Sequence, residues 1–268
     1  MRTFHEFEQA GWQRAAGHYP AAFGSLTSQA IEPLLDAARV SRAVRMLDVA
    51  TGPGYAAAAA DARGATAIGI DFSAAMLELA RAEHPGIEFR EADAQALPFA
   101  DASFDAVVMN FGLLHLAHPD RAIAEAWRVL DRGGRYAFTI WAKPEYTIGF
   151  GIVLRAIERY GVANVPLPEG PPFFPFSTED ECRQLLASFE NVAVRQLPLV
   201  WRFASPDLVL NAFLRGSVRT GALLRAQTSE DLDAIQAAVR QEVVAVGQTA
   251  HGIELPMPAL LVSARKPA

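Results

Sequence analysis

The feature that most constrains the fold is a regular alternation of short apolar runs with helix-like stretches between residues 43 and 141. The apolar runs are typical of β-strands, at residues 45–50, 65–71, 87–90, 104–111 and 135–141. The stretches between them have helical composition and helical end signals, at residues 56–63, 74–83 and 119–130. This alternation predicts an α/β fold, a Rossmann-like doubly wound sheet covered on both faces.

The flanking sequence predicts a helical cap before the sheet and a lid after it. One or two helices are expected within residues 4–35. Later, two strand candidates at residues 191–203 and 253–266 enclose a helical stretch at 206–247, interrupted around 217–221. We expect these two strands to form a hairpin that completes seven strands, with the helices inserted between them. The predicted organisation is a single domain, with cap 1–42, α/β core 43–143, and lid and final strands 144–268.

Composition excludes several other classes of protein. The chain carries 24 Lys and Arg against 30 Asp and Glu, a net charge of −6, which disfavours binding to nucleic acid. Its single cysteine, Cys182, cannot form an internal disulfide and fits a reducing compartment. No apolar run approaches the roughly 20 residues that span a bilayer. We therefore expect a cytoplasmic protein without nucleic-acid or membrane partners.

The most informative segment is the loop Thr51-Gly52-Pro53-Gly54, between the first strand and the following helix. Glycines lack a Cβ, so a ligand can approach the backbone there, and the helix start offers free N–H groups. Asp71, at the end of the second strand, is placed to accept hydrogen bonds from two ribose hydroxyls. A structural turn is the alternative role for this loop taken alone.

Two further carboxylates distinguish between classes of nucleotide. Asp48 precedes the glycine loop, where a carboxylate repels a diphosphate and attracts an amino group. Asp93 follows the third strand, at the sheet edge expected to hold Asp71, and can accept a hydrogen bond from an adenine amine. A helix cap is the alternative role for Asp93. The pattern favours a nucleoside ligand with an amino group over a dinucleotide.

These residues resemble class I S-adenosylmethionine-dependent methyltransferases, in the branch similar to ubiquinone- and menaquinone-pathway and other small-molecule methyltransferases. The resemblance covers about residues 26–141 and consists of five motifs in the family's order. The motifs are Leu47-Asp48-Val49-Ala50-Thr51-Gly52-Pro53-Gly54, Gly69-Ile70-Asp71-Phe72-Ser73-Ala74-Ala75-Met76-Leu77, Asp93-Ala94-Gln95-Ala96-Leu97-Pro98-Phe99, Phe104-Asp105-Ala106-Val107 and Arg128-Val129-Leu130-Asp131-Arg132-Gly133-Gly134. One departure is Ala50-Thr51, where many members carry Gly-Cys or a similar small pair.

The resemblance implies S-adenosyl-L-methionine as cofactor, S-adenosyl-L-homocysteine as its product, and a small-molecule methyl acceptor. The positions that it assigns to the cofactor are Tyr19, Asp48, Ala50, Gly52, Gly54, Asp71, Phe72, Met76, Asp93, Ala94 and Asn110. Among these, Gly52, Gly54 and Asn110 would meet the methionyl part, and Asp48 would organise the loop or face the amino group. The assignment of Tyr19 to the cofactor rests on its position in the sequence alone, and a tyrosine packed in the core is the alternative.

The sulfonium of this cofactor already carries an activated methyl group, so in-line displacement needs mainly proximity and orientation of the acceptor. Where the acceptor must lose a proton, His115 after the fourth strand is the predicted base. The alternative is a histidine that is hydrogen-bonded within a loop. His118 lies three residues further on, but no carboxylate accompanies the pair on a helical face, and we expect no metal.

Aromatic residues outside the cofactor core predict an apolar or aromatic acceptor. The candidates for its binding wall are Trp141, Phe174, Phe176 and Trp201, with ordinary core packing as the alternative for each.

Two other functions remain open from sequence. A nicotinamide-dependent oxidoreductase shares the glycine loop and Asp71, but Asp48 and the lack of a Tyr-x-x-x-Lys pair weaken it. A protein that binds S-adenosylmethionine without methyl transfer, regulatory or cyclase-like, would carry the same motifs. We expect a monomer or a homodimer.

Overall fold

Seven strands form the central sheet of the computed structural model, which describes residues 2–268. Their order is β3-β2-β1-β4-β5-β10-β6. The first five pair in parallel, whereas β10 is antiparallel to both β5 and β6. Their bounds are β1 (Arg45–Val49), β2 (Thr66–Asp71), β3 (Glu88–Glu91), β4 (Phe104–Asn110), β5 (Leu130–Trp141), β6 (Glu190–Leu197) and β10 (Ala259–Arg265). The predicted doubly wound, seven-stranded sheet is confirmed.

Helices cover both faces of this sheet because successive residues of its buried strands are apolar and point to opposite sides. Met46 of β1 packs in one core cluster, together with α3 (Ile31–Ala37) and α4 (Tyr55–Ala62). Leu47, its neighbour, packs in a second cluster on the other face. There the sheet is covered by α6 (Pro119–Val129) and α8 (Glu179–Leu185). The helix α5 (Ala74–Glu83) packs beside β3.

The two late strand candidates each break into two strands that belong to different sheets. The first becomes β6 and β7 (Val200–Phe203), and the second becomes β9 (Gly252–Pro256) and β10. With β8 (Gln248–Thr249), β7 and β9 form a separate three-stranded sheet. Pro198 and Pro258 lie at the breaks, because proline has no N–H to donate to a ladder. The expected antiparallel pairing is confirmed for β6 with β10 and for β7 with β9, but the expectation of two unbroken strands was wrong.

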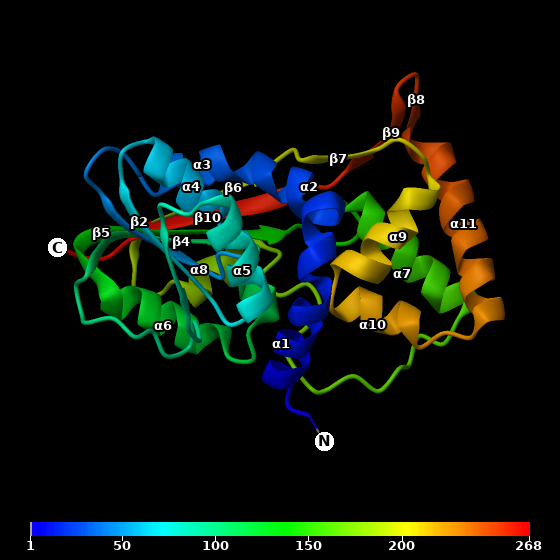
Figure 1. The fold of residues 1–268 in the computed structure, drawn as a ribbon, viewed down its shortest axis with the longest axis horizontal. Helices are drawn as coiled ribbons and strands as arrows, with labels where there is room; N and C mark the ends of the chain where they lie inside the picture. The colour runs from blue at the N-terminus through cyan, green and yellow to red at the C-terminus, as the bar shows by residue number, and fades with distance from the viewer. Residues whose placement is uncertain (1) are drawn as a thin grey trace.

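The cap and the inserted helices meet beside the carboxyl-terminal edge of the main sheet. The cap begins with α1 (Phe4–Ala15) and continues through short turns to α2 (Ser25–Thr27). The later helices are α7 (Ile148–Tyr160), α9 (Asp207–Gly216), α10 (Arg219–Arg225) and α11 (Ser229–Gly247). Figure 1 shows α1 running between the sheet and these later helices. As predicted, the helical stretch is interrupted after Gly216.

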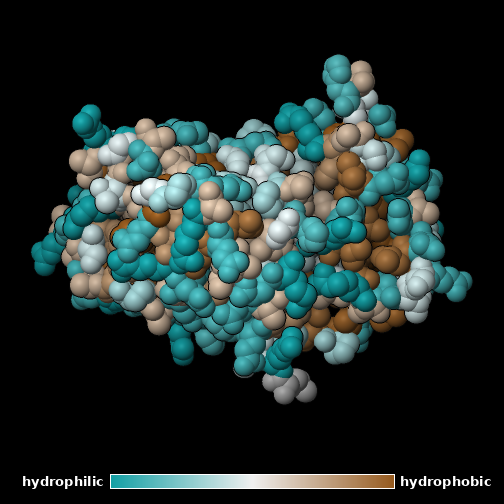
Figure 2. All heavy atoms as spheres, in the orientation of Figure 1, coloured by the Kyte–Doolittle hydropathy of each residue, from teal (hydrophilic) through white to brown (hydrophobic). Residues whose placement is uncertain are grey.

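The face of the molecule in this orientation is divided by polarity. Figure 2 shows mainly polar residues over the sheet half, and more apolar atoms over the half built from the later helices. Among the helices that the structure describes, none is both long and apolar enough to cross a membrane.

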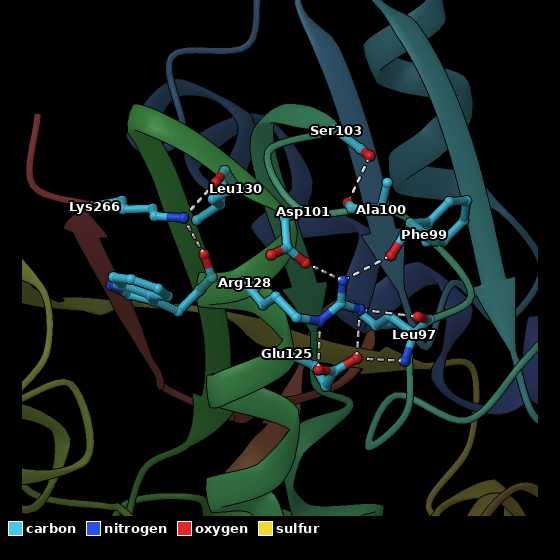
Figure 3. A network of polar contacts seen from close by, with 10 residues as sticks. Leu97, Phe99, Ala100, Asp101, Ser103, Glu125, Arg128, Leu130 and Lys266 are labelled. Carbon is cyan, nitrogen blue, oxygen red and sulfur yellow. Dashed lines mark hydrogen bonds and ion pairs between the residues drawn. The ribbon is translucent and has the colours of Figure 1, made fainter.

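Arg128 of α6 holds the loop between β3 and β4 against that helix (Figure 3). Its guanidinium donates to the carbonyls of Leu97 (3.0 Å) and Phe99 (2.7 Å) and to the carboxylate of Asp101 (2.9 Å). It also donates through two nitrogens to Glu125, and the Leu97 N–H donates to the same carboxylate at 2.7 Å. Arg128 holds the pKa of Glu125 below its usual value. One side chain thereby satisfies loop carbonyls that are partly removed from water.

We predict that Arg128→Ala lowers the free energy of unfolding by about 1–3 kcal/mol, because partly buried acceptors lose their donor. Urea unfolding followed by circular dichroism measures this difference. Arg132→Ala is the matched control, since Arg132 is exposed and, within the described part of the chain, its side chain forms no hydrogen bond or ion pair. Equal midpoints for the two variants would contradict the proposed role of the network.

Candidate active site

A cavity opens where the carboxyl ends of the parallel strands meet the cap and the inserted helices. It encloses about 1020 Å³ of space, including its open mouth. Its wall contains residues that end or directly follow β1, β2, β4 and β5. The residues predicted from sequence that line it are Tyr19, Ala50, Gly52, Asp71, Phe72, Met76, Asp93, Ala94, Asn110, His115 and Trp141. The position agrees with the rule that α/β sheets hold ligands at the carboxyl ends of their strands.

The glycine loop leaves one side of the cavity free of side chains. Gly52 has φ +54°, and a Cβ built on it would meet no atom within 4 Å. Gly54 is different, because its Cβ would lie 2.6 Å from the ring of Phe89. Gly54 also has φ +84° and precedes the first residue of α4. The expectation that both glycines face the ligand is therefore corrected: Gly54 serves the turn and the contact with β3.

Asp71 is held at the end of β2 by two backbone donors. Its Oδ2 accepts from the N–H of Gly52 and its Oδ1 accepts from the N–H of Ser73, both at 2.9 Å. Burial raises the pKa of Asp71 to about 6, and these two hydrogen bonds act in the opposite direction. The carboxylate is thus fixed in orientation at the cavity wall, with further lone pairs left for a ligand.

Asp48 organises the loop from beneath and does not line the cavity. Its Oδ2 accepts from the hydroxyl of Thr51 at 2.6 Å and from the N–H of Ala57 at 3.1 Å. The residue is only 1% exposed, and burial raises its pKa to about 7. Of the two roles expected for Asp48, the structure supports organisation of the loop.

Asp93 lines the cavity, and its carboxylate is hydrogen-bonded to Gln95, two residues further along the chain. It accepts from the backbone N–H and the side-chain amide of Gln95, at 2.9 and 3.0 Å. Gln95 in turn accepts from the N–H of His118. Within residues 2–268, no group of three His, Cys, Asp or Glu side chains is placed to hold a metal ion.

A chain of hydrogen bonds connects the cap to the end of β4. The hydroxyls of Tyr19 and Thr27 lie 3.0 Å apart, and the Asn110 amide donates to the carbonyl of Thr27 at 3.2 Å. Asn110 also accepts from the hydroxyl of Thr139 at 2.7 Å. Burial raises the pKa of Tyr19 to about 12. Tyr19 lines the cavity, and its hydroxyl is held by Thr27 of α2, whose carbonyl in turn contacts Asn110.

His115 reaches the cavity from the turn after β4, and α1 packs against it. Its Nδ1 lies 2.9 Å from Oε2 of Glu8, and its ring stands edge-on to Trp12 with centroids 4.8 Å apart. Arg219 of α10 approaches the other oxygen of Glu8, with Nε at 3.4 Å. Sequence reasoning missed Glu8, Trp12 and Arg219. A signal existed for Glu8, since it shares the buried face of α1 with Phe4, Gly11 and Ala15.

Of the four aromatic residues expected to line the acceptor wall, only Trp141 lines the cavity. Trp141 lines the cavity and stacks on Phe111 with ring centroids 4.1 Å apart. Trp201 is instead a core residue, 1% exposed, whose indole N–H donates to the carbonyl of Ala22. Phe174 lies behind the wall, edge-on to Phe150.

Phe176 packs in the core cluster on the α6 and α8 face, away from the cavity. The phenylalanines that complete the aromatic wall are Phe23, Phe111, Phe150 and Phe173.

The strand order, the glycine loop and the oriented Asp71 together define a Rossmann-like protein with a nucleoside-binding edge. A family model described as a methyltransferase domain matches residues 47–138. The demethylmenaquinone methyltransferase of Streptomyces avermitilis is 32% identical over 166 residues, which cover 58% of this chain and 72% of that protein. The chain belongs to the class I methyltransferases, in the branch of the quinone-biosynthesis enzymes.

Other relatives match a shorter part of this chain. The demethylmenaquinone methyltransferase of Renibacterium salmoninarum is 38% identical over 42% of this chain and 48% of its own length. That of Thermus thermophilus is 44% identical over 41% of this chain and 53% of its own length. The matched region thus spans about half the length of these relatives.

Solved structures show the same fold at low sequence identity. The [4+2]-cyclase SpnF has a TM-score of 0.61 at 19% identity, over 99% of this chain and 97% of that chain. The phosphoethanolamine N-methyltransferase 2 of Haemonchus contortus, in complex with S-adenosyl-L-methionine, has a TM-score of 0.59 at 18% identity. That alignment covers all of this chain and 61% of the other.

The burial of Asp48 makes stability depend on pH. Its pKa is raised from 3.8 to about 7 in the folded protein, so the folded state holds a proton that the unfolded state loses. The contribution of the Asp48 side chain to the free energy of unfolding is complete below pH 3.8 and is lost as the pH rises through about 7. We predict that Asp48→Asn loses less stability than the unsubstituted protein between pH 5 and pH 8, as measured by urea unfolding.

The control is Asp61→Asn, an exposed aspartate of α4, whose profile should run parallel to that of the unsubstituted protein. A parallel profile for Asp48→Asn as well would contradict the assignment.

Proposed function

We propose that this protein transfers a methyl group from S-adenosyl-L-methionine to a small apolar or aromatic acceptor. The observation that carries the proposal is one continuous cavity, with the glycine loop and Asp71 in one part of its wall and Trp141 and Phe150 in another. A nucleoside cofactor and an apolar acceptor can therefore be held in contact. Family membership supports the same activity.

The residues present fit the cofactor. The open Gly52 allows close approach of a ligand, and the oriented Asp71 can accept from ribose hydroxyls. Asp93 can accept from the adenine amine, while Ala94 leaves room for the ring and Met76 and Phe72 flank it. Ala50, Asn110 and Tyr19 would surround the methionyl part. When bound, S-adenosylmethionine supplies a methyl group on a sulfonium, whose sulfur keeps the electron pair of the bond that breaks.

The acceptor would lie between the aromatic side chains of the wall. Trp141 and Phe111 form one stacked pair, and Phe23 and Phe150 form another, with centroids 6.4 Å apart. Such surfaces favour a flat or apolar molecule and exclude water from the reacting atoms. The protein then contributes mainly proximity and orientation.

His115 is the residue that we propose as proton acceptor. Its Nδ1 is hydrogen-bonded to Glu8, whereas within residues 2–268 its Nε2 has no hydrogen-bond partner and is available to a ligand in the cavity. An acceptor that loses its proton to Nε2 becomes a stronger nucleophile toward the methyl group.

We further propose that the chain works as a single domain, with cap 1–42, core 43–143 and lid 144–268. Aromatic contacts between the cap and the lid, such as Phe23 with Trp201 at 4.5 Å, support this. The net charge of −6 supports a reaction without nucleic acid, and the free cysteine supports a cytoplasmic site of action. We propose that the protein acts as a monomer or a homodimer.

Calorimetric titration tests the cofactor. We expect S-adenosylmethionine and S-adenosylhomocysteine to bind and NADH not to bind. Asp71→Ala should weaken binding by about 1–3 kcal/mol, because charge-assisted hydrogen bonds are lost. Asp61→Ala, which removes an exposed carboxylate from α4, should leave the Kd unchanged. Binding of NADH alone would overturn the proposed function, and an unchanged Kd for Asp71→Ala would overturn the ribose assignment.

Turnover tests the role of His115. With an acceptor found by screening apolar and aromatic molecules, His115→Gln should lower kcat by about 10²–10⁴-fold and leave the Kd for S-adenosylhomocysteine unchanged. Formation of S-adenosylhomocysteine and methylated product is followed by mass spectrometry. An unchanged kcat would dismiss the base, and binding of S-adenosylmethionine with no transfer to any acceptor would favour the regulatory or cyclase-like alternative.

A further inference from the structure

Glu8 is a carboxylate buried in the middle of the cap helix. It has no exposed side-chain surface, although α1 has an outer face on which its other charged residues lie. Burying a carboxylate costs free energy unless partners compensate for the lost water. The groups that contact Glu8 must therefore compensate for its burial.

Its two oxygens have different neighbours, one in the core and one in the lid. Oε2 lies 2.9 Å from Nδ1 of His115, and Oε1 lies 3.4 Å from Nε of Arg219. The side chains of His115 and Arg219 are 18% and 8% exposed, so all three groups are largely shielded from water. Cap, core and lid each contribute one charged or titratable group to this cluster.

Arg219 is held firmly enough to place Glu8. It donates to the carbonyls of Pro171 and Pro172, at 2.8 and 3.1 Å. Its guanidinium also lies over the rings of Phe4 and Phe173, 4.6 and 5.4 Å from their centroids. Burial lowers the pKa of Arg219, and the carboxylate of Glu8 acts in the opposite direction.

Close backbone packing fixes α1 against the same part of the lid. Gly11, three residues after Glu8, is in contact with Val218, and a Cβ at Gly11 would collide with that side chain. Gln13 accepts hydrogen bonds from the Ser73 hydroxyl and from the Ala75 N–H, which anchors the helix to α5 as well. The position of the carboxylate is thus determined from both sides.

We propose that Glu8 is a positioning residue, which holds His115 in the tautomer that carries its proton on Nδ1 and leaves Nε2 as the acceptor facing the cavity. A carboxylate only accepts hydrogen bonds, so it selects a ring whose Nδ1 is protonated. This inference rests on the proposed function, in which Nε2 takes the proton of the methyl acceptor.

The proton balance follows from this arrangement. The acceptor's bond to hydrogen breaks, its electron pair remains on the acceptor for the new bond to carbon, and the proton moves to Nε2. The imidazolium then formed lies against the Glu8 carboxylate, which stabilises the positive charge. Arg219 gives the carboxylate a permanent positive neighbour before and after the transfer.

The first test needs no substrate. ¹⁵N spectra of histidine-labelled protein, recorded at alkaline pH, distinguish the two neutral tautomers, and the signals of His115 are those absent from His115→Gln. We expect the Nδ1–H form in the unsubstituted protein. In Glu8→Gln the amide can donate to Nδ1, so the Nε2–H form should become populated, and Glu8→Asp should restore the original form at least in part.

The second test is a double-mutant cycle on kcat. Glu8→Gln should lower kcat by about 10- to 100-fold, with KM and the Kd for S-adenosylhomocysteine unchanged within about twofold. In the His115→Gln background the same substitution should change kcat by less than about twofold, because Glu8 acts through the imidazole. Thr3→Ala is the matched control, since it weakens α1 through its amino-terminal cap, and its effect should be equal in both backgrounds.

Each outcome decides the inference. If Glu8→Gln keeps the Nδ1–H form, or if its effect on kcat persists fully without His115, Glu8 does not position the base. If Glu8→Gln does not fold, Glu8→Gln combined with Arg219→Met removes both buried charges, and the same ¹⁵N signals are read. A tautomer shift without any methyl transfer in the unsubstituted protein would mean that the proposed function fails while the positioning contact stands.

Discussion

The site depends on the hydrogen bond between the carboxylate of Asp71 and the N–H of Gly52, which joins the ends of β2 and β1. Backbone groups that leave a strand at the edge of a sheet have no ladder partner, so side chains must satisfy them. Asp71 does this for the loop and for the start of α5, while Asp48 holds Thr51 and Ala57 from beneath. The loop is therefore rigid and yet open towards the cavity at Gly52.

A rigid loop at a sheet edge supplies only the floor of a site, and the cap and the lid supply the rest. Phe23 of the cap packs on Trp201 and Phe213, and Arg219 of the lid reaches Glu8 of the cap. These contacts enclose the aromatic part of the cavity and shield His115 from water. One fold can serve many reactions when such segments vary while the edge of the sheet is kept.

Local sequence patterns predicted well which residues line the cavity beside the glycine loop, and predicted its aromatic wall poorly. The strands and their order in the chain follow from apolar periodicity, and Gly52, Asp71 and Asp93 all lie on the cavity as expected. Gly54 was assigned to the ligand, but its lack of a Cβ accommodates Phe89, a contact that the motif alone does not reveal. Trp201 was assigned to the wall, but its buried N–H needs an acceptor and finds one in the core at Ala22.

The alternation of strands and helices, the glycine loop and the acidic residues at strand ends are encoded locally, because each depends on the period of one segment or on the φ of one residue. Periodicity could not decide where a proline would divide a strand between two sheets, nor which aromatic side chains would meet across the cavity. The cluster of Glu8, His115 and Arg219 is the clearest case, since its members belong to α1, the turn after β4 and α10. Their meeting is decided by the packing of cap and lid against the sheet, which no single stretch of the sequence specifies.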